Sequence, residues 1–140
     1  HAVKKGHCKT NYLVLQQPHC QGGHYKYIMI VGYSNAKTHK LCTDAKTAKK
    51  ELGDKVAINL FKRLSWLGAA DNLAIFNGTF NCLRLHKLKG KYSKYYAIDI
   101  TKGYRLIFYP CSEDGILIEN ANFETITVVT IEEVNNHYDD

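Results

Sequence analysis

Long apolar runs and a regular cysteine pattern are missing from this sequence. No apolar run approaches the roughly 20 residues that a membrane-spanning helix needs, and no apolar stretch near the N terminus resembles a secretory signal. The five cysteines are an odd number at irregular spacing, which is not the framework of a disulfide-stapled secreted domain. We therefore expect reduced thiols, no membrane partner and a cytoplasmic protein.

The composition is that of one soluble globular domain with an excess of positive charge. Of the 140 residues, 45% are hydrophobic and 23% are charged, which is typical of a folded chain. The net charge is +6 and the pI is about 9.0. Because Lys and Arg release counterions when they lie against phosphates, this charge favours a polyanionic partner.

Residues 1–24 differ from the rest of the chain. They have little hydrophobic periodicity and contain a Gly-Gly pair, so we interpret them as an N-terminal extension of a domain that spans residues 25–140. The extension contains side chains of the types that bind zinc, at spacings that fit no standard finger: His7, Cys8, His19, Cys20 and His24. Incidental clustering explains them better, and we expect no metal.

One strand and two helices are predicted in the first half of the domain. Residues 25–33 are rich in aromatic and branched side chains and predict a strand. Thr43 and Asp44 suit the start of a helix that ends at Leu52, and Asp54 suits the start of a second helix. In that second helix, apolar side chains recur at three- and four-residue spacing and form one stripe.

After Asn77-Gly78 the hydrophobic period changes to two, which is typical of strands. Further strands are predicted at residues 82–86, 95–100, 104–109 and 126–134. The pattern predicts an α+β fold, in which two N-terminal helices pack on one face of a mostly antiparallel sheet of four to five strands. We expect the other face of the sheet to be open.

Polar and basic side chains gather at the predicted strand that ends at His86. Alternation in this strand turns Arg84 and His86 toward the open face. The loop that follows mixes lysines with tyrosines, and such side chains pair with phosphates and stack on unpaired bases of RNA. The candidate RNA-binding residues are Arg84, Lys87, Lys91, Lys94 and Tyr95. A solvated, lysine-rich hairpin tip is the other interpretation of the loop.

Arg105 lies in the middle of a strand that is expected to be central in the sheet. It either forms an ion pair with Asp99 across the hairpin or presents its fork of donors to a phosphate. At the C terminus, His137 and Tyr138 either belong to a frayed tail or lie beside Arg105 and complete a ribonuclease site without a metal ion.

Three segments of the domain resemble one known family. They are LHKLKGKYSKYYAIDITKGYRLIFYP from Leu85 to Pro110, the preceding SWLGAADNLAIF, and the C-terminal TVVTIEEVNNHYD. Together they are similar to the HigB branch of the RelE/ParE toxin superfamily, and the similarity covers most of the chain after the extension. The resemblance implies a RelE-like fold, a toxin of a type II toxin–antitoxin system, and ribosome-dependent cleavage of mRNA.

By this resemblance, the active-site positions are His86, Lys89, Arg105 and His137. The C terminus departs from the family pattern, because close relatives end in Asp-Tyr-His whereas this chain has Asn-Asn-His-Tyr. The acid is therefore absent and Tyr138, also a candidate catalytic residue, is displaced. The implied partners are the ribosome, its mRNA, and a cognate antitoxin that is a small helix-turn-helix protein.

The expected reaction needs no cofactor. RNA supplies its own nucleophile in the 2′-OH, so the protein must remove that proton, stabilise charge on the phosphorane and protonate the leaving 5′-oxygen. We assign Arg105 to the phosphate, and Lys89 or His137 to proton transfer. Since we find no clustered pair of carboxylates in the domain to hold magnesium, we expect metal-free cleavage.

Two other functions fit the same residues. A ParE-like gyrase poison shares the fold and binds a protein without catalysis, although its members generally lack the full His, Lys, Arg and His set. A non-catalytic RNA-binding module uses the same cations to position a ligand. Fold alone does not separate the three functions.

Overall fold

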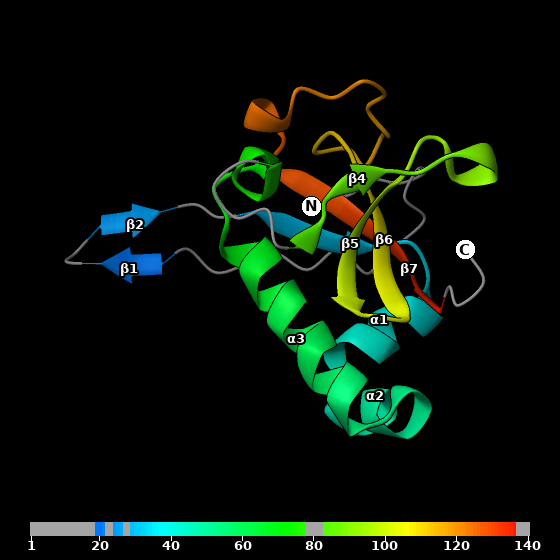
Figure 1. The fold of residues 1–140 in the computed structure, drawn as a ribbon. Helices are drawn as coiled ribbons and strands as arrows, with labels where there is room; N and C mark the ends of the chain where they lie inside the picture. The colour runs from blue at the N-terminus through cyan, green and yellow to red at the C-terminus, as the bar shows by residue number, and fades with distance from the viewer. Residues whose placement is uncertain (1–18, 22–23, 27–28, 78–82, 137–140) are drawn as a thin grey trace.

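A computed structural model describes residues 19–21, 24–26, 29–77 and 83–136 (Figure 1). These residues form an α+β fold, with three α-helices and a mixed five-stranded sheet. The helices are α1 (Ala36–Thr43), α2 (Ala45–Leu52) and α3 (Asp54–Ala69). The strands of the sheet are β3 (Ile30–Tyr33), β4 (His86–Lys87), β5 (Tyr96–Thr101), β6 (Tyr104–Pro110) and β7 (Val128–Asn136). The predicted α+β class is confirmed.

The order of strands in the sheet is β3-β7-β6-β5-β4. β7 runs antiparallel to β6 on one side and parallel to β3 on the other, where Ile30 lies opposite Val128. The β6–β5 and β5–β4 pairs are also antiparallel, so the sheet is mostly antiparallel, as expected. The first strand of this sheet therefore lies beside the last, with three helices and three strands between them in sequence.

The prediction of two helices is wrong, because α1 precedes them. Asn35 caps α1, where its side-chain oxygen accepts a hydrogen bond from the backbone N–H of Thr38 at 2.8 Å. Only Thr38 and Cys42 of α1 are buried, so the helix carries no apolar stripe that a sequence pattern reveals. Asp44 ends α1 and also precedes α2, which produces a sharp corner between two short helices.

α3 is the long helix that covers the sheet (Figure 1). It begins at the predicted Asp54, but Gly53, at φ 88°, is the residue that precedes the first turn and Asp54 lies inside that turn. Arg63 ties the helix to the end of β5 by donating hydrogen bonds to the carbonyl oxygens of Asp99 (2.9 Å) and Ile100 (3.1 Å). These bonds hold the two layers in a fixed relative position.

The main hydrophobic core lies between the helices and one face of the sheet. Tyr96, Ile98 and Ile100 of β5 belong to this core, whereas the residues between them turn to the opposite face. The core is completed by side chains from the helices and the other strands, among them Leu60, Leu67, Leu106, Phe108, Val129 and Ile131. The period of two in the sequence thus separates a core face from a second face.

Two predicted strands differ from the structure. The strand expected over residues 25–33 is divided into β2 (His24–Lys26) and β3, and β2 pairs with β1 (His19–Gln21) in a separate two-stranded sheet. The predicted boundary at residue 25 thus falls inside β2. The strand expected over residues 82–86 is reduced to β4, because Arg84 at φ 57° interrupts the extended backbone.

The α-helices in the described ranges are short or amphipathic. None of them is long and apolar enough to cross a membrane.

Candidate functional site

The second face of the sheet carries the candidate residues that lie on its strands. Residues directly opposite each other on paired strands point to the same face, and His86, Ala97, Ile107 and Glu133 form one such row across β4, β5, β6 and β7. Asp99, Arg105 and Asn135 form the adjacent row. The register therefore places His86 and Arg105 on the same face of the sheet.

The spacing between His86 and Arg105 is set by the sheet. Two strand spacings of about 4.8 Å separate β4 from β6, so the two backbones lie roughly 10 Å apart. Arg105 is partly buried on β6.

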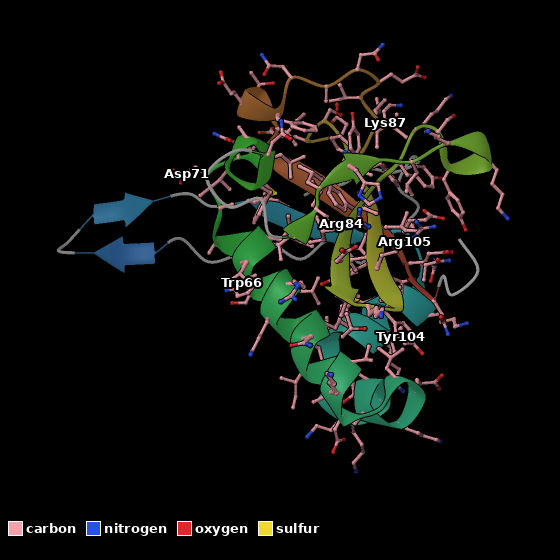
Figure 2. The ribbon with its side chains drawn as sticks, viewed as in Figure 1. Trp66, Asp71, Arg84, Lys87, Tyr104 and Arg105 are labelled. Atoms are coloured by element: carbon pink, nitrogen blue, oxygen red, sulfur yellow. The ribbon has the colours of Figure 1, made fainter. Side chains whose placement is uncertain are left out.

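Arg84 and Asp99 form an ion pair at the edge of the same face. The Arg84 Nε lies 2.7 Å from Oδ2 of Asp99 and its Nη2 lies 3.3 Å from Oδ1, and these hydrogen bonds raise the pKa of Arg84. Figure 2 labels Arg84 before β4 and Arg105 on β6. Asp99 lies opposite Arg105 in the register, but its carboxylate is held by Arg84.

His86 has a defined orientation. Its Nδ1 lies 2.6 Å from the carbonyl oxygen of Arg84. A carbonyl oxygen is only an acceptor, so Nδ1 carries the proton and donates. In the neutral ring, Nε2 is then the nitrogen that accepts a proton.

The basic loop packs onto the sheet and covers part of the second face. Leu88 contacts Ala97 and Ile107 in a small hydrophobic cluster, and the rings of Tyr92 and Tyr95 pack against it. A 3₁₀ helix over Gly90–Tyr92 and a hydrogen bond from the N–H of Leu88 to the carbonyl of Tyr95 (3.0 Å) close the loop. The expectation of a fully open face is therefore corrected.

A hydrogen bond joins this loop to β7. The Tyr92 hydroxyl donates to Oε2 of Glu133 at 2.9 Å, and Nδ2 of Asn135 donates to the same oxygen at 2.9 Å. The hydrogen bond to Glu133 is the largest cause of the raised pKa of Tyr92. The loop is thus connected to β5 and β6 by an apolar contact and to β7 by a hydrogen bond.

A β-bulge adds a second carboxylate to the face. In the β6–β7 pair, Ile107 lies opposite Glu133 and Phe108 opposite Ile131, so Glu132 has no residue opposite it. Burial raises the pKa of Tyr95 most, and the charges of Glu132 and Glu133 raise it further. Glu132 and Glu133 are thus consecutive acidic residues at the bulge.

The tyrosines of the loop continue an aromatic row into β6. The rings of Tyr92 and Tyr95 are tilted at a centroid distance of 5.8 Å, and those of Tyr95 and Tyr109 are stacked at 5.5 Å. Sequence patterning proposed Tyr95 but not Tyr109, Glu132 or Glu133. Alternation in β6 indicates Tyr109, whereas the bulge that redirects Glu132 leaves no signal in the sequence.

The predicted lysines point to different parts of the surface. Lys87 donates to the carbonyl oxygen of Ser93, Lys91 lies 5.4 Å from the ring centre of Tyr92, and Lys94 lies 3.2 Å from Glu119. Lys89 is exposed at the start of the 3₁₀ helix. The predicted catalytic residues His137 and Tyr138 lie outside the described residues.

Comparisons with family models, curated proteins and solved structures find no significant match to this chain. Within the part of the chain that the structure describes, there is also no group of three or more His, Cys, Asp or Glu side chains that holds a metal ion. Functional inference therefore depends on the arrangement of side chains on the second face.

Proposed function

We propose that this chain is the toxin of a type II toxin–antitoxin system and cleaves ribosome-bound mRNA without a metal ion. The observation that supports it is the convergence of His86 and Arg105 from different strands on one face. The tyrosines of the basic loop and β6 border the same face. This face thus contains a cation that can bind the phosphate and a histidine that can accept the proton of the 2′-OH. It also contains tyrosine rings that can stack on nucleobases.

In this mechanism Arg105 binds the non-bridging oxygens of the scissile phosphate and stabilises the charge of the phosphorane. Nε2 of His86 accepts the proton of the 2′-OH, since Nδ1 is held by the Arg84 carbonyl. The 2′-oxygen forms a bond to phosphorus as the bond to the 5′-oxygen breaks. Lys89 or His137 gives a proton to that oxygen, and the products are a 2′,3′-cyclic phosphate and a 5′-OH.

The carboxylates of Glu132 and Glu133 give this face a mixed charge. Glu133 is occupied by Tyr92 and Asn135, so its role in the proposal is to position the loop beside the substrate. The two carboxylates repel phosphate. We therefore expect the RNA backbone to pass over Arg105 and His86 and to avoid Glu132 and Glu133.

The experiment is cleavage of an mRNA on programmed ribosomes by the purified chain, with the ends of the products identified. We expect 2′,3′-cyclic phosphate or 3′-phosphate ends together with 5′-OH ends, because the 2′-OH is the nucleophile. Products with 3′-OH and 5′-phosphate ends contradict the proposed mechanism, because water is then the nucleophile, and make Glu132 and Glu133 candidate ligands for a metal ion.

The same preparation separates the alternatives. A non-catalytic RNA-binding module binds the mRNA and leaves it intact. A ParE-like protein leaves RNA intact and inhibits purified gyrase instead. Either result replaces the nuclease assignment.

A further inference from the structure

Two segments of the domain carry an excess of positive charge. Residues 84–105, on and beside the proposed catalytic face, contain seven Lys and Arg against one Asp. Residues 36–63, which span most of the three helices, contain eight Lys and Arg against three Asp and Glu, a net charge of +5. In Figure 1, α1 and α2 lie at the opposite end of the molecule from the β6–β7 connection, where residues 112–125 contain four acidic side chains and no Lys or Arg.

Part of this charge surrounds a cavity. A cavity of about 460 Å³ opens at the corner between α1 and α2, and Lys37, Lys40 and Lys50 are among the residues that line it. Lys37 and Lys40 are three residues apart on α1 and therefore share a face. Leu41 and Glu51 also line the cavity, so its walls carry three positive charges and one negative charge.

These lysines are not used to hold the fold. All three are exposed, and none forms an ion pair with another described residue. Arg63 on α3 shows the contrast, because its guanidinium is committed to the carbonyl oxygens of β5. Like charges held together around a concave surface destabilise a fold slightly, which is consistent with a ligand of opposite charge.

We infer that the α1–α2 corner binds the phosphate backbone of RNA, with Lys37, Lys40 and Lys50 as its phosphate contacts. The choice of RNA as the ligand rests on the proposed function, whereas the positive charge and the cavity are features of the structure itself. Lysine is a compact, flexible point charge that contacts successive phosphates without reading bases. The protein then holds RNA at the α1–α2 corner and performs chemistry on the second face of the sheet.

The test uses a short 2′-O-methyl RNA hairpin, which the proposed reaction does not cleave because it lacks the 2′-OH. The variant is Lys37→Gln, Lys40→Gln and Lys50→Gln in the full chain. We expect affinity to fall at least about tenfold at low salt, and the slope of log affinity against log salt to decrease by about 2 to 3, since each lost phosphate contact removes roughly 0.7–0.9. Thermal melting of the variant should match the parent.

A matched control adds three negative charges at exposed positions near the opposite end: Asn77→Asp, Ile116→Asp and Asn120→Asp. We expect it to change affinity about twofold at most. An equal loss in control and lysine variant means that only bulk charge matters and overturns the inference, as does unchanged affinity in the lysine variant. Tighter binding of poly-glutamate than of the hairpin also overturns it, in favour of an acidic protein segment.

The two proposals fail separately. If the parent binds the hairpin through these lysines but leaves ribosome-bound mRNA intact, the RNA-binding role of the α1–α2 corner is supported and the nuclease function is refuted. If the lysine variant binds the hairpin as tightly as the parent while the parent cleaves mRNA, the nuclease stands and this surface is refuted.

Discussion

Arg84 binds the carboxylate of Asp99 at two points, with N···O distances of 2.7 and 3.3 Å, although Asp99 lies opposite Arg105 in the sheet. The ion pair neutralises the acid that is nearest to Arg105 in the register. Arg84, which has a left-handed backbone conformation, is therefore an ion-pair partner of Asp99.

Arg84→Gln is expected to weaken RNA binding with little loss of stability. The Arg84 side chain is 60% exposed and that of Asp99 30%, and exposed pairs contribute about 0.2–1 kcal/mol. Without Arg84, the Asp99 carboxylate repels phosphate beside Arg105. Urea titration and hairpin affinity measure the two effects, and Arg84→Gln with Asp99→Asn is expected to restore affinity. A double variant as weak as the single one refutes this account.

Arg105→Ala is expected to abolish growth arrest and reduce mRNA cleavage at least about a hundredfold, the usual cost of losing one group that stabilises the transition state. Arg105→Lys should recover part of the activity, because a single point charge replaces the fork. Circular dichroism and melting verify that the variants are folded. A folded Arg105→Ala protein that remains fully toxic shows that Arg105 is structural.

Tyr92→Phe is expected to lower stability by about 1 kcal/mol at neutral pH, because it removes the hydrogen bond to Glu133. The pKa of Tyr92 is raised in the folded state, so the stability it contributes is present below the unfolded pKa of about 10 and is lost as the pH rises through the folded value. The difference between parent and variant should therefore shrink above about pH 10. A difference that stays constant in urea titrations well above about pH 10 contradicts the assignment.

Cys42 and Cys111 are expected to resist alkylation in the native protein. Both are buried, and burial raises the pKa of the Cys42 thiol to about 12, so its thiolate is scarce at neutral pH. Iodoacetamide labelling with peptide mass spectrometry compares native and urea-unfolded samples. Rapid native labelling at Cys42 is inconsistent with its place in the core.

A helix-turn-helix protein encoded beside this chain is expected to bind it and restore translation in a reporter assay. Binding to the folded state alone adds apparent stability by mass action, so the complex should melt above the free chain. A neighbouring protein that neither binds nor restores translation counts against the toxin–antitoxin proposal and supports a plain RNA-binding module.

Periodicity predicts the elements whose burial follows a simple pattern. The strands β5, β6 and β7 and the apolar stripe of α3 are visible in the sequence because alternate or helical spacing marks a buried side. α1 is not visible, since two buried residues make no stripe. The sequence pattern predicts an extended backbone at Arg84, whereas the structure has a left-handed one. The ion pair of Arg84 with Asp99 is a tertiary contact that local sequence does not reveal.

The second face is predictable in its strand residues and not in its loop. Alternation predicts that His86 turns to the face opposite the core, and the pairing of His86 with Ala97 agrees with this. The contact of Leu88 with Ala97 and Ile107 depends on how residues 88–95 fold back, which local sequence does not determine. The bulge at Glu132 likewise depends on pairing with a distant strand.

The parallel pairing of β3 with β7 makes the order of synthesis matter. A nascent chain that ends before residue 128 has made β3 and all three helices, but the strand that pairs with β3 and joins it to β6 is still missing. Contacts of such long sequence separation form slowly. Until β7 is made, a growing chain therefore lacks both the completed sheet and the assembled face that is proposed to attack RNA.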